Sequence, residues 1–253
     1  MLTHSNHLYL FTKMKIALIG YGKMGKAIEA IALERGHTII AKINSQHPIQ
    51  SSEVHEADVA IEFSRPDKVI DHISYCLNGS IPIVVGTTAW QAHFEAIKEQ
   101  TLAKNGTLLY ASNFSIGVNV FFELNKKLAQ LMHGKIDYTA AMEEIHHLQK
   151  LDAPSGTAIT LAHGIMENNS DYSSWVLGEE KNPYTTESQL GITSFRKPDV
   201  PGTHTIHYTS EVDTLTISHE AHSRKGFALG AVIAAEWLQK KKGVFTMNDV
   251  LNF

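Results

Sequence analysis

Between residues 15 and 110, short apolar runs alternate with longer stretches in which apolar residues recur at helical spacing. The short runs are rich in isoleucine, valine and leucine, which is typical of buried strands. Strand, helix and strand in this order predict a parallel, doubly wound sheet. The predicted strands are residues 16–19, 38–41, 59–63, 81–85 and 107–110. One predicted helix follows the first strand and ends near residue 35, and two others cover 67–77 and 91–104. Gly36 is expected to cap the first of these helices.

The pattern changes after about Phe114. We predict a helix at 118–133, a strand at 136–147, a helix at 155–168, strands at 191–196, 203–209 and 213–222, and a helix at 227–242. Consecutive strands favour a mixed or antiparallel sheet, hence a second domain. The fold class is therefore α/β: a Rossmann-type parallel-sheet nucleotide domain (14–115 and 225–253) plus an α+β substrate domain with a mixed sheet (116–224). The last helix is expected to pack on the first domain through Phe227, Leu229, Val232, Ile233 and Trp237.

Residues 1–13 lack the basic start, long apolar stretch and cleavage site of a secretory signal, so we interpret them as a disordered extension.

Composition narrows the function classes further. A net charge of -4 does not favour nucleic-acid binding, and no apolar run approaches the roughly 20 residues of a membrane-spanning helix. Cys76 is the single cysteine, so an internal disulfide is excluded and a reducing, cytoplasmic location is expected.

A glycine-rich turn lies between the first predicted strand and the first helix. It reads Gly20-Tyr21-Gly22-Lys23-Met24-Gly25, which fits the G-x-G-x-x-G pattern of dinucleotide sites. In that pattern the glycines permit a tight turn, close approach to a pyrophosphate and close helix packing. The alternative is a glycine-rich turn in an unrelated α/β protein, but the strand and helix around it favour dinucleotide binding.

The carboxyl ends of the strands should form the rest of this site. The second strand ends in Lys42-Ile43-Asn44, without the carboxylate that usually binds the NAD ribose, so the sequence leaves NADH and NADPH open as cofactors. Arg65 either contacts the adenine or a phosphate, or is a solvated residue at a helix start. The candidate cofactor-binding residues are Gly20, Tyr21, Gly22, Lys23, Met24, Gly25, Asn44, Phe63, Ser64, Arg65, Gly86, Thr87, Thr88, Ala111, Ser112, Asn113 and Phe114.

A second group of reactive residues lies between residues 143 and 158. His146 and His147 end a predicted strand, where neighbouring side chains point to opposite faces, so we expect different roles for them. Lys150 adds a charge, and Ser155, Gly156 and Thr157 begin a helix whose N–H groups suit a carboxylate or phosphate. These features fit a pocket for an anionic substrate with a proton-transfer group. A capped helix after a strand, with satisfied polar histidines, fits the spacing equally well.

The segment His146-His147-x-x-Lys150-x-Asp152-Ala153-Pro154-Ser155-Gly156-Thr157-Ala158 resembles the signature of the dihydrodipicolinate reductase family. The resemblance extends from about residue 15 to 251. It includes Lys23-Met24-Gly25, Glu62-Phe63-Ser64-Arg65-Pro66, Gly86-Thr87-Thr88, Ser112-Asn113-Phe114-Ser115-x-Gly117-Val118-Asn119 and Ser223-Arg224-x-x-Phe227-Ala228-x-Gly230-Ala231. Glu62, Ala89 and Asn44 depart from the usual aspartate, glycine and acidic residue, which leaves cofactor preference and loop shape open.

The resemblance implies hydride transfer from NADH or NADPH to C4 of a cyclic, dicarboxylated imine in diaminopimelate and lysine biosynthesis. It assigns His146 as the proton donor and Lys150 as its assistant and a substrate ligand. His147, Gly156 and Thr157 would hold the substrate carboxylates. It also implies a homotetramer built through the substrate domains. Hydride addition builds negative charge on the ring, so a proton donor beside a lysine suits the transition state.

The remaining histidines do not indicate a metal site. His204 and His207, and likewise His219 and His222, are three residues apart on predicted strands, so each pair should face opposite ways. We expect them at the sheet surface or a subunit interface, with no metal bound. Two other functions stay open: a dinucleotide sensor, which needs only the glycine loop, and a metal-dependent hydrolase, which needs a third ligand that the spacing does not supply.

Overall fold

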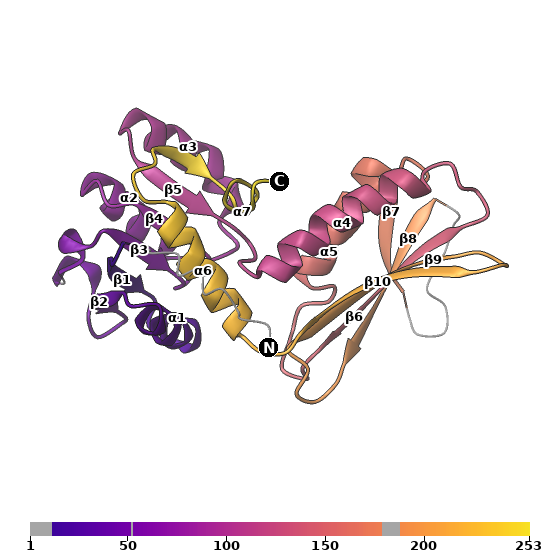
Figure 1. The fold of residues 1–253 in the computed structure, drawn as a ribbon, viewed down its shortest axis with the longest axis horizontal. Helices are drawn as coiled ribbons and strands as arrows, with labels where there is room; N and C mark the ends of the chain where they lie inside the picture. Colours follow the sequence, from indigo (N-terminus) through magenta and orange to yellow (C-terminus); the bar gives the residue numbers. More distant parts are fainter. Residues whose placement is uncertain (1–11, 52, 179–187) are drawn as a thin grey trace, which may run out of the picture. The chain divides into compact units, whose positions relative to one another are not determined.

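A computed structural model describes residues 12–51, 53–178 and 188–253 of the chain (Figure 1). The chain forms two compact units, and each is described by itself. One contains the chain up to Ala111 together with Ala228–Asn252, and the other contains Ser112–Phe227. The expected extension at 1–13 lies outside the described residues, apart from positions 12 and 13.

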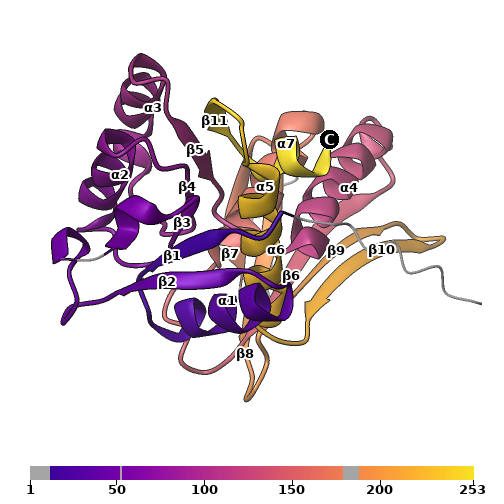
Figure 2. The ribbon, with the colours of Figure 1, turned by 60° about the vertical axis from the view of Figure 1, so that its left-hand side comes forward.

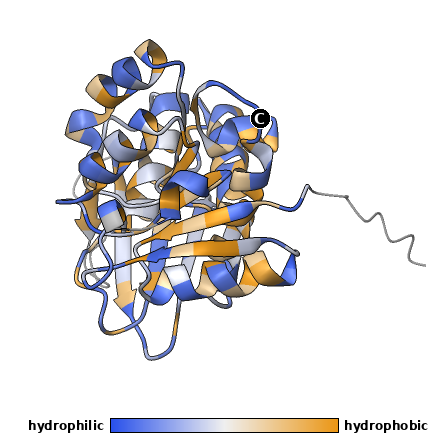
Figure 3. Cartoon of the chain, turned by 90° about the vertical axis from the view of Figure 1, so that its left-hand side faces the viewer, coloured by the Kyte–Doolittle hydropathy of each residue, from blue (hydrophilic) through white to orange (hydrophobic). Residues whose placement is uncertain are grey.

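The first unit contains a six-stranded parallel sheet in the order β11-β5-β4-β3-β1-β2. Its interior is apolar because strands covered on both faces contact no water. Figure 3 shows strands in this region coloured as hydrophobic, with hydrophilic residues on the surrounding helices and loops. The strands are β1 (Lys15–Ile19), β2 (Thr38–Ile43), β3 (Val59–Glu62), β4 (Ile83–Val85), β5 (Thr107–Tyr110) and β11 (Gly243–Phe245).

Helices connect these strands much as the sequence predicts. The first ends as expected, because Gly36 has a φ of +87°, a left-handed conformation that glycine adopts without strain. The helices are α1 (Lys23–Glu34), α2 (Val69–Asn78), α3 (Phe94–Ala103), α6 (Lys225–Trp237) and α7 (Met247–Leu251), with short 3-10 helices at Ile49–Ser51, Glu53–Glu56 and Gln91–His93. The sequence analysis did not predict α7 or β11.

Helix α6 returns the end of the chain to the first unit, where it lies beside α1 (Figures 1 and 2). The expected buried face was wrong in detail, since Val232 is buried but Phe227, Leu229, Ile233 and Trp237 are only partly buried. Small residues fill that face instead, and they allow the helix to approach its neighbours closely. They are Ala228, Gly230, Ala231, Ala234 and Ala235.

The second unit contains a mixed five-stranded sheet in the order β10-β9-β6-β8-β7. Strand β6 pairs parallel with β8 and antiparallel with β9. The elements are α4 (Ile116–Met132), β6 (Thr139–His146), α5 (Gly156–Asn168), β7 (Ser174–Gly178), β8 (Gln189–Arg196), β9 (Gly202–Thr209) and β10 (Thr214–Ala221). Helices α4 and α5 pack against one face, where Phe121, Leu161 and Ile165 meet Met142 and Ile206. The fold class predicted from the sequence is confirmed.

Two strand predictions in this unit needed correction. Strand β6 begins at Thr139 rather than at residue 136, because Ile136 is 91% exposed and the turn before the strand still contains it. Strand β7 was missed because it is a short edge strand that pairs only with β8 among the described strands. In the part of the chain that the structure covers, no helix is both long and apolar enough to cross a bilayer.

Candidate functional site

The glycine-rich turn joins β1 to α1, and each of its glycines has a different environment. Gly20 has a φ of +93°, and an added Cβ would lie 2.2 Å from the Phe63 carbonyl oxygen. A Cβ on Gly25 would lie 2.6 Å from the Gly20 carbonyl oxygen. A Cβ on Gly22 would meet no protein atom within 4 Å, so this position is open. These three roles are the ones that a pyrophosphate-binding turn assigns to its glycines.

The start of α1 is also free to receive an anion. Gly22 is the N-cap of this helix, and no side chain caps it. The first N–H groups of a helix have no partner within the helix and carry a partial positive charge. Lys23 and Met24 follow on the first turn, so their backbone N–H groups are available for a phosphate.

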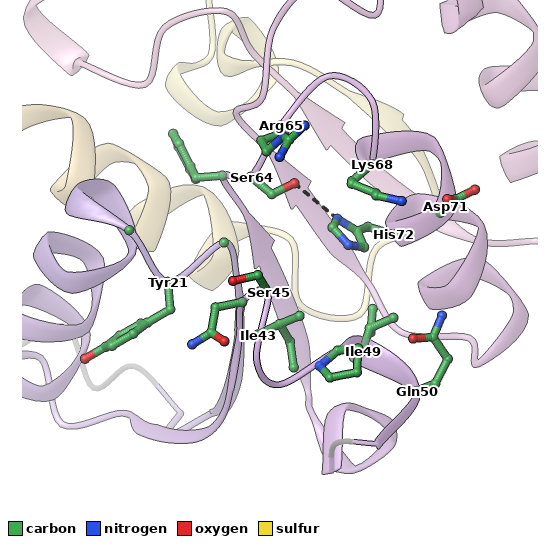
Figure 4. Close-up of a pocket in the computed structure, with 15 residues that line it drawn as sticks. Tyr21, Ile43, Ser45, Ile49, Gln50, Ser64, Arg65, Lys68, Asp71 and His72 are labelled. Atoms are coloured by element: carbon green, nitrogen blue, oxygen red, sulfur yellow. Dashed lines mark hydrogen bonds between the residues drawn. The ribbon is translucent and has the colours of Figure 1, made fainter.

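A cavity of about 650 Å³ opens beside this turn (Figure 4). Seven of the predicted cofactor residues line it: Gly20, Tyr21, Gly22, Asn44, Phe63, Ser64 and Arg65. In Figure 4, Tyr21 and Ser45 lie on one side of the cavity and Lys68, Asp71 and His72 on the other. The sequence analysis did not identify the lining residues Ile43, Ser45, Pro48, Ile49, Gln50, Lys68, Asp71 and His72. All of these except Ile43 follow the end of β2 or β3 along the chain, which was the available signal.

Contacts at the end of β2 bear on the choice of cofactor. Lys42 could contact the 2′-phosphate of NADPH, but it pairs with Glu29 at 2.6 Å, and its ammonium lies 4.9 Å from the centre of the Tyr21 ring. The Asn44 side-chain oxygen accepts the N–H groups of Gln46 and His47 at 2.8 and 3.0 Å. The oxygen is therefore used within the loop, and the amide nitrogen is the part of Asn44 suited to a ribose hydroxyl.

A buried glutamate organises the end of β3. Glu62 is fully buried, and its Oε1 accepts the Ser64 N–H at 3.1 Å and also the Ser64 hydroxyl. His72 Nδ1 lies 3.2 Å from the Ser64 hydroxyl, the contact drawn in Figure 4. The Ser64 N–H also donates to Thr87 Oγ1 at 2.8 Å. The turns after β3 and β4 are thus held together at the edge of the cavity.

The other predicted cofactor residues fall into two groups. Gly86 makes room for Phe63, because a Cβ there would lie 2.2 Å from the Phe63 ring, and Thr88 is exposed beside it. Ala111 ends the first unit, whereas Ser112, Asn113 and Phe114 belong to the second. Asn113 donates to Thr157 Oγ1 at 3.4 Å, so the two sequence motifs that contain these residues meet.

In the second unit, His146 lies at the carboxyl end of β6. It is 8% exposed and lies on the same strand face as Glu144, because residues two apart on a strand point the same way. Its Nδ1 is 3.2 Å from Glu144 Oε2, an ion-pair distance without hydrogen-bond geometry. The neighbouring His147 lies just beyond the strand and is partly exposed. The two histidines therefore have the different settings that the sequence predicts.

Lys150 and His147 differ in how their side-chain nitrogens are engaged. The Lys150 ammonium is held by the two carboxylate oxygens of Asp152 at 2.7 and 2.8 Å. Burial opposes the charge on Asp152, but hydrogen bonding to Lys150 outweighs it and lowers the pKa of the Asp152 carboxyl. His147 Nδ1 is buried without a hydrogen-bond partner among the described residues.

The start of α5 matches the expected anion site in two of three positions. Ser155 caps the helix, as predicted, by accepting the Ala158 N–H at 3.2 Å. The Ser155 N–H is not free, however, because it donates to Glu144 at 3.1 Å. The N–H groups of Gly156 and Thr157 are the ones left for a ligand, and a Cβ on Gly156 would meet no protein atom within 4 Å.

His204 is placed differently from our expectation of a surface or interface residue. It is 4% exposed, its Nε2 lies 3.0 Å from the Ser155 hydroxyl, and its ring centre is 5.1 Å from that of His146. Burial, and then the charge of His146, lower the pKa of His204 to about 3. His207 does lie on the opposite face of β9, as the odd spacing predicts.

One potential ligand atom from each of Glu144, His146 and His204 lies within 4.8 Å of the other two. The fold thus brings together three potential metal ligands, which the sequence spacing did not reveal. The Glu144 oxygens are already engaged by the Ser155 N–H, the Ser194 hydroxyl and the Arg196 guanidinium. A divalent cation here would compete with these donors.

Family models match both halves of the chain. Residues 14–114 match the model described as "Dihydrodipicolinate reductase, N-terminus", and residues 117–251 match "Dihydrodipicolinate reductase, C-terminus". The chain belongs to the dihydrodipicolinate reductase family. The resemblance noted in the sequence is thereby confirmed, and the chain is an oxidoreductase of a family that uses NADH or NADPH.

Curated relatives and solved structures agree with this membership. The chain is 49% identical to the 4-hydroxy-tetrahydrodipicolinate reductase of Christiangramia forsetii, over 94% of this chain and 98% of that one. It is 36% identical to the enzyme of the same name from Akkermansia muciniphila, over 91% and 94% of the two chains. The dipicolinate-bound dihydrodipicolinate reductase from Paenisporosarcina sp. TG-14 shares the fold, with a TM-score of 0.70, 22% identity and coverage of 93% and 98%.

Proposed function

We propose that this protein reduces 4-hydroxy-tetrahydrodipicolinate to tetrahydrodipicolinate with NADH or NADPH, in diaminopimelate and lysine biosynthesis. Membership of the reductase family and 49% identity to a relative of that name support the reaction. The single observation that carries the chemistry is the placement of His146, Lys150 and the start of α5 at one end of the second sheet. The Ser155 N–H and His146 Nδ1 both reach the same Glu144 oxygen.

The first unit is proposed to hold the dinucleotide. The residues fit, because the uncapped start of α1 and the open Gly22 position suit a pyrophosphate, and Asn44 suits the adenosine ribose. When bound, the cofactor supplies the hydride that reaches ring C4. Asn44 replaces the usual acidic ribose ligand and Lys42 is paired with Glu29, so neither residue commits the site to one cofactor.

The second unit is proposed to bind the dicarboxylate and to deliver the proton. The substrate carboxylates are bound by the backbone N–H groups of Gly156 and Thr157. The His147 ring and the Lys150 ammonium bind them as well. The 4-hydroxyl group of the substrate leaves the ring as water. His146 donates the proton that balances the charge built up on the ring when hydride adds to C4. Lys150 exchanges its bond with Asp152 for one with the substrate, which places a positive charge beside the reacting ring.

Cofactor oxidation tests this proposal directly. Purified protein is mixed with NADH or NADPH and freshly generated substrate, and the loss of reduced cofactor is followed optically. We expect turnover that falls by about 10²- to 10⁴-fold in His146→Gln, and by a large factor in Lys150→Ala. His207→Gln is the matched control, because His207 faces the opposite side of the second sheet. Full activity in His146→Gln would exclude its role, and cofactor binding without turnover would favour the sensor.

We also propose a cytoplasmic homotetramer formed through the second units. The family resemblance supports the assembly, and a buried, unpaired Cys76 fits a reducing compartment. Light scattering during size-exclusion chromatography tests the assembly. A monomeric mass at working concentration would contradict it.

A further inference from the structure

Glu144 is a buried carboxylate to which the proposed reaction gives no role. Its side chain is completely buried on β6, two residues before His146 and on the same face of the strand. Burying a charge is costly unless it is paired and hydrogen-bonded. The neighbours of Glu144 therefore indicate what this carboxylate does.

Four elements of the second unit hold Glu144 in place. From β8, the Ser194 hydroxyl donates to Oε1 at 2.7 Å, and the Arg196 guanidinium lies 3.4 Å from the same oxygen. From the start of α5, the Ser155 N–H donates to Oε2 at 3.1 Å. Oε2 also lies 3.2 Å from His146 Nδ1 and 3.8 Å from His204 Nε2 on β9.

These contacts keep the carboxylate ionised. Burial by itself raises the pKa of Glu144, but the close approach of His146 and the hydrogen bonds from Ser155 and Ser194 outweigh burial and hold that pKa well below its usual range. A permanent negative charge therefore lies against one nitrogen of the His146 ring.

The other charged or titratable groups near His146 do not supply this charge. His204 on β9 is neutral at physiological pH, because burial lowers its pKa to about 3. Arg196 on β8 is positive and directed at Glu144, and Lys150 in the loop after β6 is positive and paired with Asp152. Gly202 lies on the far side of the His146 ring. A Cβ at position 202 would lie only 3.0 Å from His146 Nε2, so a glycine here keeps side-chain atoms away from that nitrogen.

We propose that Glu144 is a positioning residue that fixes Nδ1 of His146 and stabilises the protonated ring, so that Nε2 delivers the proton. A carboxylate on one ring nitrogen sets both the orientation of a histidine and the identity of its reactive nitrogen. The inference rests on the proposed function in assigning the proton to His146, but the electrostatic pairing stands without it.

The test uses Glu144→Gln, which keeps the shape and loses the charge, and Glu144→Asp, which withdraws the carboxylate by one methylene. Glu143→Gln is the matched control, because Glu143 is exposed on the opposite face of β6. The titration of the His146 ring in the substrate-free protein is followed by NMR, with His146→Gln used to assign its signal. Thermal unfolding monitored by circular dichroism identifies which variants are folded.

We expect the midpoint of the His146 titration to move to lower pH by about one unit in Glu144→Gln and by less in Glu144→Asp. Glu143→Gln leaves it unchanged. In turnover assays kcat falls about ten- to a hundredfold in Glu144→Gln and its pH profile moves the same way, while KM for the dinucleotide stays the same. An unchanged midpoint and kcat in either folded variant would overturn the proposal. A shifted midpoint in a protein without reductase activity would instead refute the proposed function alone.

Discussion

His37 Nε2 donates to Oε1 of Glu236 at 2.8 Å, joining residues that are 199 positions apart in the chain. The direction of the bond follows from the other ring nitrogen, because His37 Nδ1 accepts the Met14 N–H at 3.3 Å and the proton is therefore on Nε2. Arg35 completes the group with two bonds of 2.7 Å to the same carboxylate. Glu236 thus fastens α6 to the end of α1.

Glu236→Ala is expected to lower the free energy of unfolding by about 3 kcal/mol, because it leaves His37 and Arg35 without the carboxylate that compensates their burial. Urea unfolding measures the change. Glu34→Ala removes an exposed glutamate at the end of α1 and should stay within about 0.5 kcal/mol of the parent. Equal stabilities for the two variants would show that the Glu236 group contributes little.

Gly22→Ala separates cofactor binding from folding. A Cβ at Gly22 would meet no protein atom within 4 Å, so the variant should unfold at nearly the parent temperature. The added methyl group would occupy the space that a pyrophosphate must enter, so we expect dinucleotide affinity to fall by about tenfold or more. Calorimetric titration with NADH and NADPH measures it. Unchanged affinity for both would place the phosphates elsewhere.

His204 should make stability depend on pH. Its pKa is lowered from 6.5 to about 3 by burial, with the charge of His146 as the next cause. As pH falls from about 6.5 toward 3, the unfolded chain binds a proton that the folded chain does not, so stability is lost by up to about 1.4 kcal/mol per pH unit. His204→Asn should reduce this slope between about pH 6 and pH 4.

The control for this measurement is His207→Asn, which removes a histidine from the opposite face of β9 and should leave the slope unchanged. Chemical unfolding at several pH values gives the free energies. If His204→Asn and the parent lose stability equally on acidification, the buried ring is not the source of the dependence.

Removing divalent metals should leave turnover intact. Glu144 Oε2, which faces His146 and His204, accepts the Ser155 N–H, and Oε1 accepts the Ser194 hydroxyl. These donors stabilise the carboxylate without a cation. We expect the same kcat before and after dialysis against a chelator, with metal content checked by mass spectrometry. Loss of activity that returns on adding zinc would favour the hydrolase-like interpretation of this cluster.

The sequence predicts the parts of the fold that have strong local signals. The glycine turn, the strands beside it and the Ser155 cap each need only a few neighbouring residues to be recognised, and the structure confirms them. The short elements β7, β11 and α7 were missed, because elements of three to five residues carry little periodicity of their own.

The candidate site shows the same division. His146 and Lys150 were found because they belong to one continuous segment with a recognisable signature. Glu144 lies just before that signature, and its spacing of two from His146 on a strand was an available signal that we did not use. His204 could not be found in this way, since it reaches the cluster only because β9 pairs with β6 in one particular register, with His204 opposite Glu144.

The open glycines at the starts of α1 and α5 have a consequence for how the enzyme responds to acidity. Gly22 and Gly156 lie at helix starts, whose backbone N–H groups do not gain or lose protons over the physiological range. Anion recognition by these N–H groups should therefore be constant with pH. The share of anion binding that the two helix starts supply would then persist in acid and alkali alike.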